Sequence, residues 1–375
     1  MSVPKTMKAV FVEAGDEPVL KSNVPLPKVK DGHLLLKTKA AAGNPTDWKH
    51  VVHKMGGVNC VLGCDVAGEI VQLGPNVDEK KFRVGDNVYG FIHGASANCP
   101  ENGAFAEYAV LDSKLAFRAP TDIRFSGKEN IPPGPITTFE GAASIPCSWG
   151  TAGATLFHHF DLKYDWSEDK PQYDFPLLVW GGATALGQAI IQLAKRFNCY
   201  SKIITVASKK HEAQLKAYGA DEVYDYHDGD IIEQIKNKYC NIKHLLDCVS
   251  STETIQQVYQ CSPDKEEAIV FNYMSMTESV IRPEIKKSNV KVDHTVIYLA
   301  LGLDIVLFGS IIPANKKYRD DSVKFVEVIN ELFLNGEFKH VPVKVYKNGL
   351  ASTLEMTDDI KNGRNSGEKL VAIFN

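Results

Sequence analysis

The sequence predicts an α/β protein with two domains, one built on an antiparallel, barrel-like sheet and one on a doubly wound parallel sheet. Three observations support this prediction: the length of 375 residues, short apolar runs in the first third, and a strand–helix rhythm from about residue 175. A chain of this length exceeds what one hydrophobic core usually organises. We therefore expect two domains of ordinary size.

The first third alternates short apolar or β-branched runs with Gly, Pro and Asp, which is typical of antiparallel strands. The expected strands are 8–13, 33–37, 69–73 and 86–90. Two stretches rich in Pro, Gly and charge, 121–139 and 161–174, are predicted to be loops.

From about residue 175 apolar strands alternate with helical segments, which indicates a parallel, doubly wound sheet of six strands. The segments expected here are strands 176–180, 203–206, 222–224, 244–247 and 267–271, and helices 186–197, 210–218 and 230–239. After a helix near 322–334, strand-like runs at 341–346 and 369–374 return the chain to the first domain. The parallel-sheet domain would then be an insertion.

Composition narrows the functional classes. Hydrophobic residues make up 44% and charged residues 23%, which is typical of a globular protein. The net charge of −4 offers no basic field to nucleic acid or an anionic membrane, so we expect a small-molecule substrate. Met1–Lys8 lacks a signal-peptide pattern, and the eight cysteines are scattered without a C-x-x-C pair. We expect a cytoplasmic protein with reduced thiols, spanning no membrane.

A glycine-rich segment, Leu177–Gly187, lies between an expected strand and an expected helix, as a dinucleotide-binding turn requires. Gly182 would make the tight turn, Gly187 would allow close packing, and N–H groups at the helix start would hold the pyrophosphate. Thr184 replaces the middle glycine, so an ordinary glycine-rich turn also fits. The residues predicted to bind the cofactor here are Gly182, Ala183, Thr184, Ala185, Leu186 and Gly187.

The end of the next strand bears on which dinucleotide binds. An acidic residue there would bind the ribose 2′-OH of NAD, whereas basic or small polar residues admit a 2′-phosphate. Strand 203–206 continues into Ala207, Ser208, Lys209 and Lys210, without a carboxylate. Lysines that open a surface helix are often only solvated, but the segment favours NADPH over NADH.

Seven segments in order resemble the medium-chain dehydrogenase/reductase family, above all its quinone oxidoreductases and fungal trans-enoyl-reductase-like members. They are residues 44–49 (NPTDWK), 63–74, 82–90, 103–108, 144–151, 218–221 and 366–371. The resemblance implies a GroES-like catalytic domain at 1–150 and 316–375 around a Rossmann cofactor domain at 151–315. It also implies that Tyr226 approaches the ribose phosphate.

The resemblance places the catalytic zinc ligands of related dehydrogenases at Asn44, Cys64 and Cys147. Asn is a poor zinc ligand, and catalytic zinc takes three strong ones from Cys, His and carboxylate. The four closely spaced cysteines of a structural zinc lobe are reduced to Cys99. We therefore expect no metal, and Cys64 and Cys147 as small buried thiols.

Without a Lewis acid, hydrogen-bond donors must polarise the substrate. The resemblance implies that Thr151 lies near the nicotinamide, that Asn44 orients the substrate in the same pocket and that Lys49 donates a proton, although a solvent-exposed lysine fits Lys49 equally. Mitochondrial enoyl reductases use a Tyr just after this segment, where this chain has Val52–Gly56. The proton donor therefore stays open, with His53 a further candidate.

The sequence thus predicts a zinc-independent, NADPH-dependent oxidoreductase, monomeric or homodimeric, that delivers hydride to an activated C=C or C=O of an enone, enoyl compound, quinone or aldehyde. Two alternatives stay open. One is a non-catalytic NADPH-binding protein of the crystallin or redox-sensor kind. The other is a trans-acting enoyl reductase partner of a polyketide synthase.

Overall fold

The computed structural model describes residues 3–13, 17–167 and 169–374, and its contacts divide the chain into two compact units. Unit 1 comprises residues up to 150 and from 298 onward, and unit 2 comprises residues 151–297. The return to unit 1 precedes the expected residue 316, because the hairpin β16 (Ile305–Leu307) and β17 (Ser310–Ile312) belongs to unit 1. The Phe308 N–H at its tip donates to the Met55 carbonyl at 2.9 Å. Met1, Ser2 and residue 168, on which parts of the sequence predictions fall, lie outside the described residues.

Unit 1 is built on a mostly antiparallel sheet in the order β8-β6-β5-β3-β19-β18-β9, with β7 also paired to β3. Its strands are β3 (His33–Ala42), β5 (Asp65–Leu73), β6 (Asn87–Phe91), β7 (Tyr108–Asp112), β8 (Ala116–Arg118), β9 (Asn130–Ile131), β18 (Val343–Tyr346) and β19 (Lys369–Ile373). A smaller sheet joins β1 (Thr6–Val12) to β2 (Val19–Pro25) and β4 (Cys60–Val61). Burial along β1 alternates from Thr6 to Ala9, as in a half-buried strand, and changes phase at Val10, which is also buried.

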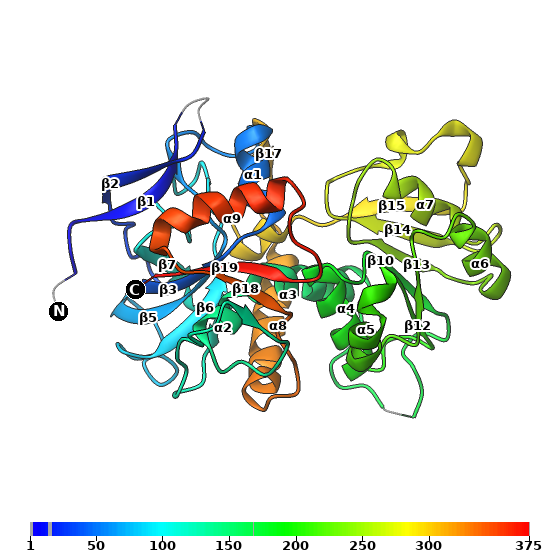
Figure 1. The fold of residues 1–375 in the computed structure, drawn as a ribbon, viewed down its shortest axis with the longest axis horizontal. Coiled ribbons are helices and arrows are strands. Elements are labelled where there is room, and N and C mark those ends of the chain that lie inside the picture. Colours follow the sequence, from blue (N-terminus) through cyan, green and yellow to red (C-terminus); the bar gives the residue numbers. More distant parts are fainter. Residues whose placement is uncertain (1–2, 14–16, 168, 375) are drawn as a thin grey trace. The chain divides into compact units, whose positions relative to one another are not determined.

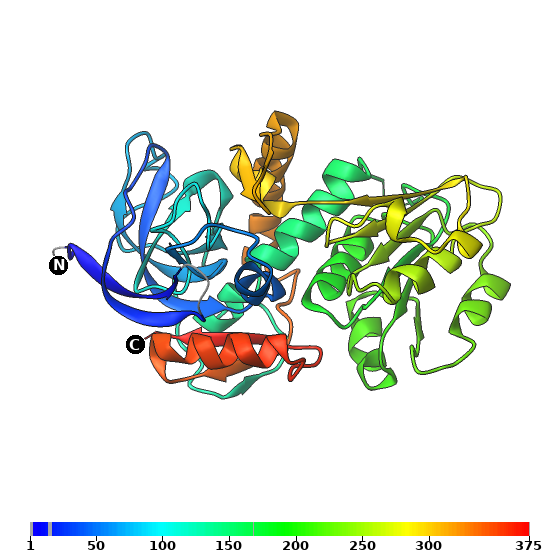
Figure 2. The same ribbon diagram turned by 90° about the horizontal axis from the view of Figure 1, so that it is seen from above.

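The C-terminal segment completes the sheet that the N-terminal segment begins. Strand β19 pairs antiparallel with β3 through Val371 and Ala42, and helix α9 (Ser352–Lys361) packs on β19 and on α1 (Pro45–Val52). Figure 2 shows this red segment beside the blue N-terminal elements. Unit 2 is therefore inserted between two parts of one sheet.

Unit 2 contains the predicted parallel sheet, in the order β12-β11-β10-β13-β14-β15 within the described residues. Its strands are β10 (Leu177–Trp180), β11 (Ile203–Val206), β12 (Glu222–Tyr224), β13 (His244–Asp247), β14 (Ala268–Asn272) and β15 (Val290–His294). Its helices are α4 (Ala185–Arg196), α5 (Glu212–Tyr218), α6 (Ile231–Lys238) and α7 (Thr254–Gln260). Helix α4 contacts β10 and β11, and α7 contacts β13 and β14 (Figure 1). The strands β10 and β11 are buried throughout, as parallel strands covered by helices are.

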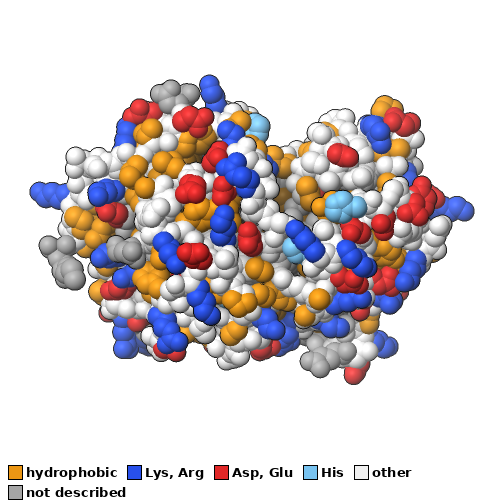
Figure 3. Space-filling model, viewed as in Figure 1, with side chains coloured by type: hydrophobic (Ala, Val, Ile, Leu, Met, Phe, Trp, Pro, Cys, Tyr) orange, Lys and Arg blue, Asp and Glu red, His pale blue; other side chains and the backbone are white. Residues whose placement is uncertain are grey.

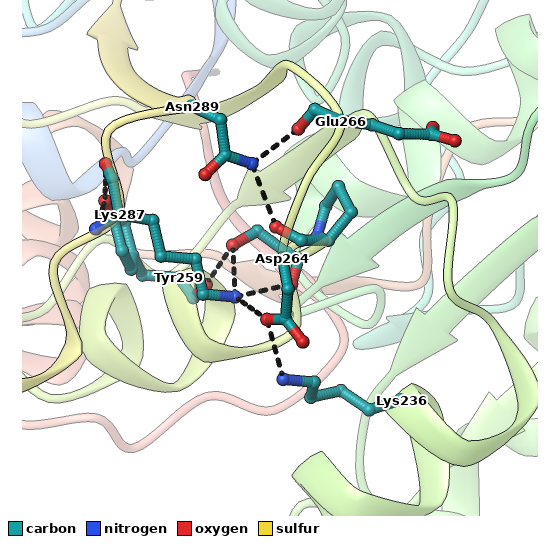
Figure 4. A network of polar contacts seen from close by, with 8 residues as sticks. Lys236, Tyr259, Asp264, Glu266, Lys287 and Asn289 are labelled. Carbon is teal, nitrogen blue, oxygen red and sulfur yellow. Dashed lines mark hydrogen bonds and ion pairs between the residues drawn. The ribbon is translucent and has the colours of Figure 1, made fainter.

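A polar network fixes the connection from α7 to β15 (Figure 4). The Lys287 ammonium pairs with Asp264 at 2.9 Å, and Asp264 also pairs with Lys236 at 3.3 Å. The Tyr259 hydroxyl accepts from the Lys287 N–H at 3.0 Å, and Asn289 Nδ2 donates to two backbone carbonyls at 2.6 and 3.1 Å. Since these polar groups have partners within the network, we assign it a structural role.

The remaining helices are α2 (Phe139–Ala143), α3 (Pro146–Gly153), which continues as a π-helix (Ala154–His159), and α8 (Lys316–Leu334). Helix α8 begins before the predicted residue 322, because the Asn315 side chain caps it by accepting from the Tyr318 N–H at 3.0 Å. Acidic and basic side chains are interspersed over the face in Figure 3. In the part of the chain described, no helix has the length and apolar character needed to cross a bilayer.

Candidate active site

The glycine-rich turn of unit 2 joins β10 to α4 and depends on three glycines. Gly181 carries the left-handed conformation, with φ of +81°, so it makes the tight turn that the sequence assigned to Gly182. Gly182 lies against β11, where an added Cβ would come within 1.8 Å of Thr205 Oγ1. A Cβ on Gly187 would lie 2.5 Å from the Gly181 carbonyl oxygen. Gly187 therefore packs so closely on Gly181 that no side chain fits at this position, which is the close packing that the sequence predicts.

Thr184 caps α4 in place of the middle glycine of the usual pattern. Its Oγ1 accepts from the Gly187 N–H at 3.0 Å. The N–H groups of Ala185 and Leu186, at the first two positions of the helix, lack intrahelical acceptors as in every α-helix. The turn thus presents N–H groups and the positive end of a helix dipole, which fits a pyrophosphate.

The residues expected to select the dinucleotide follow β11. Ser208 is half-buried, whereas Lys209 and Lys210 are exposed, and Lys209 Nζ pairs with Glu212 at 3.0 Å. Tyr226 is 51% exposed and its ring lies 4.1 Å from that of His227. Ser208, the lysines and Tyr226 follow two neighbouring parallel strands, β11 and β12, so they lie at one edge of the sheet.

Asp225 is a carboxylate at this edge that the sequence reasoning missed. Its Oδ2 accepts from the Lys209 N–H at 3.1 Å, and its Oδ1 accepts from the His227 N–H at 3.0 Å. The His227 ring nitrogen Nδ1 lies 2.6 Å from the same Oδ1. These hydrogen bonds, led by the His227 N–H, lower the pKa of Asp225. The parallel pairing of β11 and β12 was the available signal, because neighbouring parallel strands end at the same edge.

At the centre of unit 1, Asn44 belongs to a buried polar network. Its Nδ2 donates to Asp65 Oδ2 at 2.9 Å, and its Oδ1 accepts from the Lys369 ammonium. Lys369 also pairs with Asp65 Oδ2 at 3.0 Å, and the Cys147 N–H donates to Asp65 Oδ1 at 2.7 Å. Because an ammonium only donates and a carboxylate only accepts, the orientation of the Asn44 amide is fixed. Asp65 and Lys369 lie inside segments used for the family resemblance, but the sequence did not single them out.

Asp47 extends this network. The Asn44 N–H donates to Asp47 Oδ2 at 2.7 Å, at the start of α1. Burial raises the pKa of Asp47 to about 7; the Asn44 hydrogen bond opposes the shift and the Asp65 charge adds to it. A buried carboxyl with this pKa carries its proton through the mildly acidic range.

The three positions that match zinc ligands lie together in unit 1, since Asp65, which follows Cys64, bonds both Asn44 and the Cys147 N–H. The Cys64 thiol is buried, and burial raises its pKa well above the usual value. The Asn44 oxygen already faces the Lys369 ammonium. Within residues 3–13, 17–167 and 169–374, no three His, Cys, Asp or Glu side chains are arranged to hold a metal ion.

Lys49 and His53 lie on and just beyond α1. Lys49 is half-buried, its Nζ lies 5.5 Å from the Trp48 ring centroid, and burial lowers its pKa. His53 is exposed and its ring lies 5.8 Å from that of Trp48. Thr151 is the first residue of unit 2, and its carbonyl accepts from Thr155 Oγ1 at 2.9 Å. The catalytic roles assigned to Asn44, Lys49 and Thr151 stay predictions.

Two family models match the chain: the alcohol dehydrogenase GroES-like domain at residues 30–121 and the zinc-binding dehydrogenase domain at residues 185–303. An uncharacterized protein of Saccharomyces cerevisiae is 52% identical, covering 100% of this chain and 99% of its own length. The chain belongs to the medium-chain dehydrogenase/reductase family.

Other members share its full length. A trans-enoyl reductase of Petromyces alliaceus is 30% identical, covering 100% of this chain and 98% of its own length. The structure of the quinone oxidoreductase from Coxiella burnetii matches with a TM-score of 0.68 at 20% identity, over 99% of this chain and 100% of that one. The predicted combination of a GroES-like domain with a Rossmann-type parallel sheet is thereby confirmed, and family members bind nicotinamide cofactors.

The raised pKa of Asp47 makes a prediction about stability. Because the folded-state pKa of about 7 lies above the ordinary aspartate pKa of 3.8, the folded state holds a proton that the unfolded state releases. Stability therefore falls as pH rises from about 4 to 7. The ionised form costs on the order of 4 kcal/mol above that window. Asp47→Asn should therefore gain stability relative to the parent protein between pH 5 and pH 8, measured as urea unfolding midpoints.

The exposed Asp122→Asn is the control for this measurement and should follow the parent protein at both pH values. An Asp47→Asn variant with the same pH trend as the parent protein would contradict the assignment.

Proposed function

We propose that this protein transfers hydride from NADPH to an activated C=C or C=O without zinc. The observation that carries the proposal is the turn from Gly181 to Gly187, where close packing of the glycines against Thr205 and the start of α4 forms a site fitting a dinucleotide pyrophosphate. Membership of an oxidoreductase family supports hydride transfer. When bound, the nicotinamide supplies the hydride, and residues of this chain bind and polarise the acceptor.

The choice of NADPH rests on charge at the end of β11. Asp225, the carboxylate that follows β12, is already bonded by the N–H groups of Lys209 and His227. A carboxylate held in this way is less able to bind a ribose 2′-OH. Lys209, Lys210 and Ser208 offer charge and a hydroxyl to a 2′-phosphate. Tyr226 follows β12 and is exposed at the same edge of the sheet.

The proposed mechanism does not use zinc because of the side chains at the three positions that match zinc ligands, Asn44, Cys64 and Cys147. The Asn44 oxygen accepts from the Lys369 ammonium, and a second cation bound to the same oxygen would be repelled. These residues do not fit a catalytic zinc, which takes three strong ligands. Polarisation of the acceptor is therefore assigned to neutral donors.

An activated C=C is the favoured acceptor, because the relative from Petromyces alliaceus is named a trans-enoyl reductase. The deciding experiment is NADPH oxidation with a panel of enones, enoyl thioesters, quinones and aldehydes, repeated with NADH. Turnover of at least one class supports the proposal. Tight NADPH binding without turnover of any class would favour the non-catalytic alternative instead.

The cofactor assignment predicts that Lys209→Glu, Lys210→Glu and Ser208→Glu weaken NADPH binding and spare NADH. Each lost contact to a phosphate should cost roughly 1.5 to 3 kcal/mol, or about tenfold to a hundredfold in Kd. Dissociation constants from quenching of protein fluorescence would measure this. Lys202→Glu makes the same charge change at the other end of β11 and should leave both affinities unchanged. Equal losses for both dinucleotides would refute the assignment.

Metal independence predicts that activity survives dialysis against a strong zinc chelator. Cys147→Ala should also retain turnover, since the bond that this residue gives to Asp65 comes from its backbone N–H. Elemental analysis supplies the independent measurement. Stoichiometric zinc that leaves together with activity and restores it on readdition would overturn this part of the proposal.

The assignment of Thr151 predicts that Thr151→Val lowers kcat and kcat/KM together, because the hydroxyl would act in the transition state. Donors to a developing oxyanion contribute about 10²- to 10³-fold in other enzymes, so a weaker contact would still be measurable. Lys49→Met tests the proton donor and should reduce enone turnover more than quinone turnover. Full turnover by both variants on every accepted substrate would contradict these two roles.

A further inference from the structure

A second polar cluster lies beside the Asn44 network in unit 1. It consists of Thr46 and His50 on α1, His93 after β6, and Tyr298, and is called the Tyr298 cluster below. His50, His93 and Tyr298 are at most 5% exposed. The His93 ring stacks on the Tyr298 ring, with centroids 3.7 Å apart and planes at 16°. The His50 ring meets both of them edge-on at 5.7 Å.

The hydrogen bonds of the Tyr298 cluster link His50 to Tyr298 through Thr46. His50 Nδ1 lies 2.8 Å from the Thr46 carbonyl oxygen, which can only accept, so Nδ1 carries the imidazole proton. The same N–H lies 3.0 Å from Thr46 Oγ1, which is therefore an acceptor there. The Thr46 hydroxyl can then donate to the Tyr298 hydroxyl at 2.6 Å. With the Thr46 hydroxyl as the donor, the Tyr298 hydroxyl can donate its own proton to another acceptor.

The Tyr298 hydroxyl faces the Asn44 side of unit 1. Its oxygen lies 3.9 Å from the buried Cys64 sulfur, and Cys64 precedes the Asp65 that bonds Asn44. A thiol is a weak acceptor, so a carbonyl oxygen at this place would receive a stronger hydrogen bond. Thr46 follows Asn44 closely on α1, which joins the two clusters through one helix.

A second observation points to a polar ligand. Both nitrogens of His93 and Nε2 of His50 are buried without a hydrogen-bond partner. Burial lowers the pKa of His93 to about 3 and that of His50, so both rings are neutral. An unpaired buried polar atom costs about 1 to 3 kcal/mol, and native proteins retain few of them. Three such atoms around one tyrosine favour a place where a polar group of a ligand enters.

We propose that Tyr298 is a catalytic residue whose hydroxyl donates a hydrogen bond to the carbonyl oxygen of the substrate, with Thr46 and His50 as positioning residues. This inference rests on the proposed function and names the group that polarises its acceptor. For an enone, hydride adds to the β-carbon, and the C=C electrons move so that negative charge forms on the carbonyl oxygen, where Tyr298 stabilises it. The α-carbon then takes a proton from Lys49, the donor proposed above, or from water, and the carbonyl re-forms.

The test compares Tyr298→Phe, which removes only the hydroxyl, with Tyr89→Phe. Tyr89 is also buried in unit 1, where its ring stacks on that of Phe117 with centroids 5.1 Å apart, and it belongs to neither polar cluster. On a substrate that the parent protein reduces, Tyr298→Phe should lower kcat and kcat/KM about 10²-fold and leave the NADPH Kd unchanged. Tyr89→Phe should match the parent protein.

Thr46 variants test the positioning role and guard against a Tyr298→Phe protein that does not fold. Thr46→Val should lower kcat without changing the NADPH Kd, and Thr46→Ser, which restores a hydroxyl, should recover it. A structural role would not give this recovery from the hydroxyl alone. Loss of kcat in Thr46→Val that Thr46→Ser does not recover overturns the positioning role.

A folded Tyr298→Phe protein with kcat within about twofold of the parent protein, or with a change in KM alone, overturns the proposal while the proposed function stands. A parent protein that reduces no member of the substrate panel overturns the proposed function, and this inference falls with it.

Discussion

The buried ion pair between Lys369 and Asp65 is the interaction on which the rest of unit 1 depends. Asp65 begins β5 and Lys369 begins β19, so the pair joins the N-terminal and C-terminal parts of the chain at 3.0 Å. Both side chains are at most 6% exposed, and removal of one partner from such a pair costs about 3 to 5 kcal/mol. The chain must therefore return from unit 2 to complete this centre. The insertion of unit 2 between two parts of unit 1, and the assembly of the candidate site, both follow from the need to bring Lys369 to Asp65.

The ion pair also determines the direction of α1. Lys369 and Asp65 hold the Asn44 amide from its two ends, and the Asn44 N–H in turn holds Asp47. With its first residues fixed in this way, α1 brings Thr46 and His50, four positions apart, onto one helix face. The Asn44 network and the Tyr298 cluster thus share α1. The positions of Thr46 and His50 depend on the contacts that the Asn44 network makes at the start of this helix.

Much of unit 2 could be predicted from the sequence, because its central strands are continuous apolar runs. The predicted strands 203–206, 222–224 and 244–247 have the bounds found in the structure. The sixth strand, β15, was counted but not located, since its Lys291 and Asp293 are exposed at the sheet edge and interrupt the apolar pattern. Helix α9 escaped prediction for a related reason. It buries Thr353 and Thr357, whose hydroxyls bond backbone carbonyls three and four residues back.

The site was predictable only in pieces. The segments holding Asn44, Asp65 and Lys369 were each recognised, but their meeting depends on the pairing of β3, β5 and β19, which no local pattern encodes. Tyr298 lies in no recognised motif, and its contacts with Thr46 and His93 join residues more than 200 positions apart. Local reading likewise assigned the tight turn to Gly182, because the two adjacent glycines differ only in backbone conformation and neighbours.

The charges at the centre of unit 1 favour an uncharged substrate group. Lys369 and Asp65 neutralise each other, while burial raises the pKa of Asp47 and lowers that of His93. An anionic group brought here would lose its hydration and meet a cation that is already paired. A neutral carbonyl loses less on entry and gains more as charge develops on its oxygen, because fixed donors act strongly in a low-dielectric site. Under the proposed function, this arrangement would favour the transition state of hydride transfer over the bound ground state, which is the condition for catalysis.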